Sequence, residues 1–155
     1  MMDLSDLIHP EAVIPALRAN SKKQAIQAIA EKAASLTGIG EREIFETLLQ
    51  REKLGSTGVG GGIAIPHGKL PGLTRIFGLF ARLPKPIDFE ALDDQPVDLV
   101  FLLLAPEGSG AEQLKALARI ARHLREAGVA AKLRSSPDQA ALYAVLTESA
   151  ASNAA

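Results

Sequence analysis

A glycine-rich stretch from Arg51 to Lys69 gathers residues that could handle an anion. Six of the thirteen glycines of the chain lie between Gly55 and Gly68, so the backbone there is expected to turn sharply and to leave amides without helical partners. Amide N–H groups beside Arg51 and Lys69 could hold a phosphate. His67 lies where an imidazole nitrogen could reach a bound phosphoryl group. The stretch therefore predicts phosphate chemistry centred on a histidine.

Two common phosphate-binding motifs do not match this stretch. In a P-loop, a Gly-Lys pair follows a glycine five residues earlier and precedes a serine or threonine. The pair Gly68-Lys69 has Ile63 at the first glycine position and Leu70 at the hydroxyl position. A dinucleotide-binding fingerprint beginning at Gly58 or Gly60 places an isoleucine at its last glycine position. Neither kind of nucleotide site is predicted.

The role of His67 has two interpretations. It could orient the loop through a ring N–H hydrogen bond, or it could accept a phosphoryl group. Acceptance needs a neutral ring with one nitrogen held by a hydrogen bond, and amides or cations that stabilise three oxygens. The hydroxyls of Ser56 and Thr57 could bond such an oxygen, or they could only close the turn after Gly55. The predicted phosphate-binding residues are Ser56, Thr57, Gly58, Gly68 and Lys69.

Arg51 is predicted to point inward at the end of a helix. The helix is expected over residues 41–54, with Gly55 as its C-terminal cap. At ~100° per residue, Arg51 lies within about 20° of the apolar Ile44, whereas Lys53 falls on the opposite, solvated face. Arg51 could contact a phosphate, or it could complement the helix dipole with its stem packed on the core.

The rest of the chain predicts further helices around an apolar sheet. A capping box, Ser21-Lys22-Lys23-Gln24, begins a helix that Gly38 ends. Apolar residues alternate over 75–83, which predicts a strand, and they are almost continuous over 97–104, which is typical of a central strand covered on both faces. Residues 12–17 contain a proline and are expected to form an edge strand.

A second capping box, Ser109-Gly110-Ala111-Glu112, is expected to begin a helix that Gly128 ends. Gln113 borders its apolar stripe in the first turn, whereas His123 lies ~140° from the centre of the stripe and should face solvent. His9 is expected to be a surface or capping histidine. The predicted inward stripe consists of Leu114, Leu117, Ala118, Ala121 and Leu124.

Composition limits the class of protein. With 155 residues and 47% apolar content, one domain with its own core is expected over residues 1–148, followed by a disordered tail over 149–155. A net charge of −1 and 4% aromatic residues predict no nucleic-acid partner. Cysteine is absent and the three histidines are far apart, so neither a metal site nor a cofactor is predicted. The acidic N-terminus and the short apolar runs predict a cytoplasmic protein without membrane insertion.

Taken together, several segments resemble a known family. They are Arg51-Glu52-Lys53, the Gly-Ser-Thr-Gly at 55–58 with the glycine run after it, and Ile63-Ala64-Ile65-Pro66-His67-Gly68-Lys69. They are similar to the active-site signature of phosphotransferase-system IIA domains of the fructose/mannitol class, and most nearly to the stand-alone nitrogen-regulatory type. The resemblance extends over about residues 4–146. It implies an α/β fold, with a mixed sheet flanked by helices, and a His67 that a histidine phosphocarrier protein phosphorylates.

The chain departs from the family at one position. In many relatives a second histidine, which begins a His-Leu-x-x-Leu segment, lies beside the active one. The matching segment here begins with Gln113. Glutamine can donate a hydrogen bond to a phosphoryl oxygen but cannot carry a positive charge. With glutamine at this position, His67 could still accept a phosphoryl group. The rate of phosphorylation and any transfer of the group to another protein stay open.

The resemblance leaves three functions open. The chain could be a regulatory module whose phosphorylation state decides which cytoplasmic proteins it binds, a phosphocarrier that serves a sugar-transport IIB domain, or a degenerate IIA fold that is never phosphorylated. The sequence shows no attached IIB or membrane segment, and this favours the regulatory module. The apolar residues of the motif are expected to offer a docking surface: Val59, Ile63, Ile65 and Leu70.

Overall fold

A mixed six-stranded sheet lies at the centre of this computed structural model, which describes residues 4–148. The strand order is β1-β5-β6-β3-β2, and β4 pairs with β6 further along the same edge as β3. β6 runs antiparallel to β5 and parallel to β3 and β4. The strands are β1 (Ile8–Ile14), β2 (Gly58–Gly60), β3 (Ile63–Ala64), β4 (His67–Leu70), β5 (Phe77–Ile87) and β6 (Val97–Pro106).

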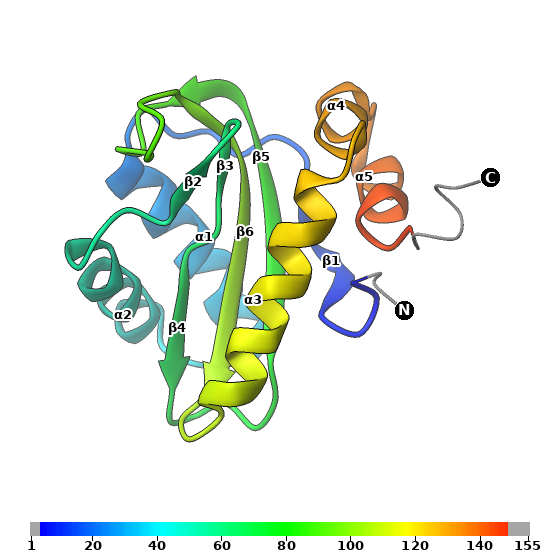
Figure 1. Ribbon diagram of the computed structural model, residues 1–155. Helices are drawn as coiled ribbons and strands as arrows, with labels where there is room; N and C mark the ends of the chain where they lie inside the picture. Colours follow the sequence, from blue (N-terminus) through cyan, green and yellow to red (C-terminus); the bar gives the residue numbers. More distant parts are fainter. Residues whose placement is uncertain (1–3, 149–155) are drawn as a thin grey trace.

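Helices cover both faces of this sheet. α1 passes behind the sheet and α3 crosses its front, while α5 lies beside β1 and α4 packs against α3 and α5 (Figure 1). α2 packs against β4, at the edge that carries His67. The predicted α/β fold, a mixed sheet flanked by helices, is confirmed. The helices are α1 (Lys22–Thr37), α2 (Glu41–Lys53), α3 (Gly110–Arg125), α4 (Val129–Ser135) and α5 (Gln139–Leu146).

The predicted central strand and the predicted edge strand are both present. β6 is buried from Leu99 to Ala105 and has strands on both sides, as its continuous apolar sequence indicates. The predicted edge strand is β1, which begins earlier than expected, at Ile8. It tolerates Pro10 because an end strand pairs on one side only. The predicted tail, 149–155, lies outside the described residues.

α1 begins and ends at its predicted caps, whereas α2 has Leu54 as its C-terminal cap in place of the predicted Gly55. Ser21 Oγ accepts a hydrogen bond from the Gln24 amide at 3.2 Å, and Gly38 adopts a φ of 79° at the end of α1. α2 ends at Lys53, so the chain leaves the helix just before Gly55. This boundary matters because the last turn of α2 carries Arg51 to the edge of the sheet.

The orientation predicted for α3 is partly right, because Leu124 is buried and Leu117 and Ala121 pack against the core, but it is wrong for Leu114 and His123. Leu114 is 70% exposed, whereas Gln113, Ile120 and His123 are buried. Alanine and leucine lie on several faces of this helix, so its apolar residues do not select one face. The two buried polar side chains have backbone partners, since His123 Nε2 lies 3.0 Å from the Val145 carbonyl and Gln113 bonds a carbonyl of β4.

One smaller helix prediction also changes. The capping box at Ser109 does not form, because the Ser109 hydroxyl donates to the Pro106 carbonyl instead. The last helix begins after Asp138, whose carboxylate accepts a hydrogen bond from the Ala141 amide at 2.9 Å. Within residues 4–148, no helix is long and apolar enough to cross a membrane.

Candidate functional site

His67 begins β4, and both nitrogens of its ring have partners. Nδ1 lies 3.0 Å from the Ile65 carbonyl oxygen, and Nε2 accepts a hydrogen bond from Nε of Arg51 at 3.2 Å. The Arg51 guanidinium is always a donor, so Nε2 must carry the lone pair and Nδ1 must carry the hydrogen. These contacts select one neutral tautomer of the imidazole.

The surroundings of His67 also keep the ring uncharged. Burial is the largest cause that lowers the pKa of His67 below its ordinary value of 6.5. The hydrogen bond to Ile65 opposes this shift, and the positive charge of Arg51 adds to it. At neutral pH the Nε2 lone pair is therefore available to act as a nucleophile.

Arg51 reaches His67 from the last turn of α2, so its predicted inward direction is confirmed. Its NH1 group also donates to the Gly55 carbonyl oxygen at 2.8 Å. The guanidinium therefore closes the end of α2 and contacts the imidazole at the same time. Lys53, two residues later, is exposed as predicted. Contact between Arg51 and a phosphoryl group stays a prediction.

Lys69 supplies a second cation on the same face of β4 as His67, because alternate residues of a strand share a face. Its side chain is extended over the start of α3, where Nζ lies 3.5 Å from the position that a Cβ on Gly110 would occupy. Lys69 is exposed and lowers the pKa of His67 through its charge, although less than Arg51 does.

Gly68 and Gln113 hold the strand that carries His67. A Cβ on Gly68 would lie 2.7 Å from Cγ2 of Thr47, so only glycine lets α2 pack this closely against β4. Nε2 of Gln113 donates to the Gly68 carbonyl oxygen at 3.0 Å. Gln113, which matches the second histidine of many relatives, thus braces the residue after His67 from the first turn of α3.

The hydrogen-bonding groups of Ser56, Thr57 and Gly58 already have partners in the loop, in α2 and after β5. The Ser56 hydroxyl donates to the Phe89 carbonyl oxygen at 2.7 Å and accepts from the Gly58 amide at 3.0 Å. Both the amide and the hydroxyl of Thr57 donate to the Glu52 carboxylate. Phosphate binding by these three residues stays a prediction, and it would require the loop to exchange these contacts.

Glu52 is an important residue that the sequence analysis missed. Its side chain is 4% exposed and pairs with Nζ of Lys22 at 2.9 Å, while it also accepts both hydrogen bonds from Thr57. The Lys22 ammonium lies 5.0 Å from the centre of the Phe89 ring. Glu52 adjoins the inward-pointing Arg51 in sequence, which was a signal that it borders the same face of α2.

The glycine run does not form the predicted phosphate cradle at His67. Residues 60–62 have positive φ and make the turn of a β2–β3 hairpin. The middle glycine donates its amide to Asp93 at 3.0 Å and accepts from Arg134 at 2.7 Å. Along β6, Ile63 and His67 pair four positions apart, which is about 13 Å at ~3.3 Å per residue. These glycine amides therefore serve the hairpin.

The other two histidines lie elsewhere. His9 is exposed on β1, and His123 is buried on α3. No group of three or more His, Cys, Asp or Glu side chains that could hold a metal ion occurs in the described part of the chain. The site consists of one neutral imidazole, two cations and a braced strand.

Comparisons with known proteins identify the family of the chain. The profile of the family "Phosphoenolpyruvate-dependent sugar phosphotransferase system, EIIA 2" matches residues 6–149. A nitrogen regulatory protein of Bradyrhizobium diazoefficiens is 68% identical over 145 residues, covering 94% of this chain and 95% of the relative. One of Escherichia coli K12 is 40% identical over 148 residues, covering 95% and 91%.

Solved structures give the same result. The nitrogen regulatory protein IIA-Ntr of Neisseria meningitidis superposes with a TM-score of 0.86 at 32% identity, covering 92% of this chain and 97% of the other. The mannitol IIA protein of Escherichia coli shares the fold, with a TM-score of 0.72 at 23% identity and coverage of 89% and 97%. This chain belongs to the EIIA 2 family of the phosphoenolpyruvate-dependent sugar phosphotransferase system and is similar to its nitrogen regulatory members.

Proposed function

We propose that this chain is a nitrogen-regulatory IIA component whose His67 accepts a phosphoryl group from a histidine phosphocarrier protein. In this proposal, the phosphorylation state decides which cytoplasmic proteins the chain binds. The observation that carries it is the pair of contacts on the imidazole: Nδ1–H on the Ile65 carbonyl and the Nε2 lone pair directed at Arg51. A ring that served only to orient the loop would need just the first of these contacts.

The transfer step involves one bond exchange. The Nε2 lone pair of His67 forms a new P–N bond, while the P–N bond of the donor breaks and returns its electron pair to the donor imidazole. The hydrogen stays bound to Nδ1, which donates it to the Ile65 carbonyl oxygen, so the acceptor ring loses no proton before it attacks. Burial, which lowers the pKa of His67, keeps the ring in this reactive form at neutral pH.

Arg51 is placed to stabilise the charge of the transferred group. Its Nε–H now points at Nε2, the atom to which phosphorus would become attached. A small rotation of the guanidinium would move this donor from nitrogen to a phosphoryl oxygen. Lys69 lies on the same face of the strand and adds a second positive charge. Two cations and no metal ion would then balance the charge spread over three oxygens.

The surroundings of the site suit regulation by docking. Three of the four docking residues predicted from the motif, Ile63, Ile65 and Leu70, are buried in the core, and the fourth, Val59, is half-buried. Two exposed leucines flank the site instead. Leu54, three residues after Arg51, is 85% exposed, and Leu114, beside Gln113, is 70% exposed. A partner that buries these leucines would meet the phosphoryl group directly, so phosphorylation would change its affinity.

Phosphorylation by a purified cascade tests this function. Incubation with phosphoenolpyruvate and a phosphorylated histidine phosphocarrier protein should add the mass of one phosphate, in an acid-labile and alkali-stable linkage. His67→Ala should abolish the addition, whereas His9→Ala should retain it. A label that persists in His67→Ala would overturn the assignment. Rapid transfer from the labelled chain to a IIB domain would favour the alternative function, a phosphocarrier for sugar transport.

A further inference from the structure

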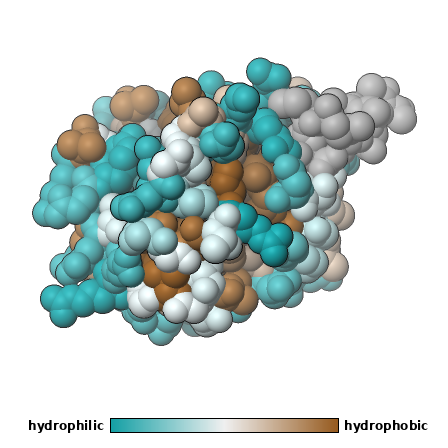
Figure 2. All heavy atoms as spheres, turned by 90° about the horizontal axis from the view of Figure 1, so that it is seen from below, coloured by the Kyte–Doolittle hydropathy of each residue, from teal (hydrophilic) through white to brown (hydrophobic). Residues whose placement is uncertain are grey.

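A hollow of about 280 Å³ lies between β1, the end of α1 and the loop that follows β4. The described residues that line it do not include His67, Arg51 or Lys69. It lies toward the end of the molecule at which β4 finishes (Figure 1). Figure 2 views the molecule from that end and shows apolar surface among charged and polar side chains. The volume is near the lower limit for small-molecule sites, so a small ligand would fill it.

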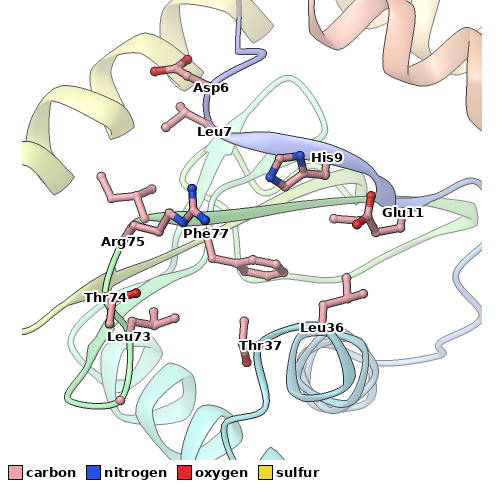
Figure 3. Close-up of a pocket in the computed structure, with 13 residues that line it drawn as sticks. Asp6, Leu7, His9, Glu11, Leu36, Thr37, Leu73, Thr74, Arg75 and Phe77 are labelled. Carbon is pink, nitrogen blue, oxygen red and sulfur yellow. The ribbon is translucent and has the colours of Figure 1, made fainter.

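Opposite charges without partners line this hollow. Arg75 and Glu11 make no side-chain hydrogen bond or ion pair within residues 4–148, and neither does His9. Figure 3 shows the Arg75 guanidinium and the Glu11 carboxylate on opposite sides of the Phe77 ring, with the His9 imidazole between them. By contrast, the nearby Asp6 already accepts two hydrogen bonds from Arg119.

β1 is irregular where it carries His9 and Glu11. Its register against β5 shifts between Ile8 and Val13, and residues 9–11 are all exposed, so both His9 and Glu11 line the hollow. Between and below them lies an apolar floor made by Phe77 and Leu36, both partly buried. The hollow thus offers a cation at one end, a carboxylate at the other and apolar surface between them.

We propose that this hollow binds an ω-amino carboxylate, a molecule in which an aliphatic chain separates a carboxylate from an ammonium group, as in 6-aminohexanoate. Arg75 would hold the carboxylate through its two-pronged guanidinium, and Glu11 would pair with the ammonium group. The methylene chain would lie on Phe77 and Leu36. This site is separate from the proposed phosphorylation site, and either proposal can fail without the other.

A ligand series tests the proposal on the unaltered chain. The probe is 6-aminohexanoate, titrated while the backbone amides are followed by NMR. Because exposed ion pairs are weak, binding in the millimolar range is expected, with shifts confined to residues 9–12, 36–37 and 73–77. Hexanoate lacks the ammonium group and hexylamine lacks the carboxylate, so each should shift these amides much less. No shift with 6-aminohexanoate, or equal shifts with all three compounds, would overturn the proposal.

Matched variants test the assigned contacts. Arg75→Gln and Glu11→Gln should each weaken 6-aminohexanoate binding by about three- to tenfold. Arg125→Gln and Glu31→Gln alter exposed residues outside the hollow and should leave the affinity unchanged. Since all four positions are exposed, the fold should persist, and the NMR spectrum verifies it. Equal affinities in all four variants would remove Arg75 and Glu11 from the site.

Discussion

Arg51 and His67 are joined by a hydrogen bond in which Nε of the arginine donates to Nε2 of the imidazole at 3.2 Å. The same guanidinium donates to the Gly55 carbonyl oxygen at 2.8 Å, so two contacts fix its position. A permanent cation lies beside the nitrogen that we propose as the phosphoryl acceptor. This geometry allows the role of the arginine in transfer to be separated from its role at the end of α2.

Replacing Arg51 with glutamine should slow the phosphorylation of His67 by roughly 10- to 1000-fold, the range that lost electrostatic stabilisation costs in other enzymes. The variant loses the positive charge and the bidentate geometry, but it keeps an amide that can still bond Gly55. The measurement is the rate of label transfer from a limiting amount of phosphocarrier protein. Arg51→Lys keeps the charge but not the bidentate geometry, so its transfer rate should lie between those of the parent protein and Arg51→Gln.

The matched control for this experiment is Lys53→Gln, since Lys53 is exposed in the same turn of α2. Its rate should equal that of the parent protein. Equal rates for the Arg51 and Lys53 variants would mean that Arg51 serves only the end of the helix.

The pH dependence of phosphorylation should follow the ionisation of His67. Burial, as the largest cause, lowers the pKa of the folded protein below 6.5, and the charge of Arg51 adds to this effect. Only the neutral ring attacks, so the transfer rate should be constant above pH 6.5 and should fall at lower pH, with its inflection at the folded pKa. NMR titration of the imidazole carbon-bound protons would give the same pKa. Arg51→Gln should move both inflections upward.

The same shift has a consequence for stability. In the unfolded chain His67 regains its ordinary pKa, so around and below pH 6.5 the unfolded state binds more protons than the folded state. Folding stability contributed by this group should therefore be complete above pH 6.5 and should decrease as the pH falls toward the folded pKa. An inflection above 6.5 in the parent protein would contradict both expectations.

Much of the scaffold could be predicted because its signals are local. Ser21 and Gly38 delimit α1, and the apolar run from Val97 identifies the central strand. The direction of Arg51 also follows from residue spacing alone, since the helix period places it near Ile44. In each case one helix or strand contains all the information that the prediction needs.

The predictions that failed depended on contacts between distant segments. Gln113 donates a hydrogen bond to a carbonyl group of β4, and the His123 ring lies against a carbonyl group of α5. These partners allow both side chains to be buried, and no pattern within α3 reveals them. The glycine run forms a hairpin turn held by Asp93 and Arg134. Neither residue is near this turn in sequence. Glycine content alone could not distinguish such a turn from a phosphate loop.

Glu52 should stabilise the loop that precedes β2. Replacing it with glutamine removes the charge that faces Lys22 and disturbs two hydrogen bonds from Thr57. The loss should be about 1–3 kcal/mol in the free energy of unfolding, because buried charged hydrogen bonds are costly to break. Lys22 keeps a second partner, Glu90, at 3.2 Å, so the loss should stay in this range. Urea denaturation measures it.

Glu46→Gln is a suitable comparison, because Glu46 forms an exposed ion pair with Arg42 within the same helix. Exposed pairs of this kind contribute about 0.3–0.5 kcal/mol, so this variant should unfold almost like the parent protein. Equal destabilisation of both variants would show that the Glu52 contacts do not hold the loop.

The last prediction concerns the proposed regulatory switch. A phosphoryl group on His67 would add about −1.5 to −2 charges at neutral pH, beside the exposed Leu54 and Leu114. A partner that covers these leucines with apolar or acidic groups would have to bury that charge or face it, so it should prefer the unphosphorylated form. His67→Ala should retain such a partner from cytoplasmic extract, and His67→Asp, a rough charge mimic, should release it.

Two leucine variants make the test specific to this surface. Leu54→Ser should lower the capture of the partner by His67→Ala, because it removes apolar area next to the site. Leu92→Ser alters a leucine that is 80% exposed and whose amide donates to the Gly58 carbonyl oxygen at 3.2 Å; because Leu92 lies beside β2 and not at the end of α2, this variant should lower the capture less than Leu54→Ser does. If His67→Ala and His67→Asp recover the same proteins in the same yield, the charge at His67 does not control docking. Partner binding would then not depend on phosphorylation, and the role left for phosphorylation would be onward transfer of the phosphoryl group.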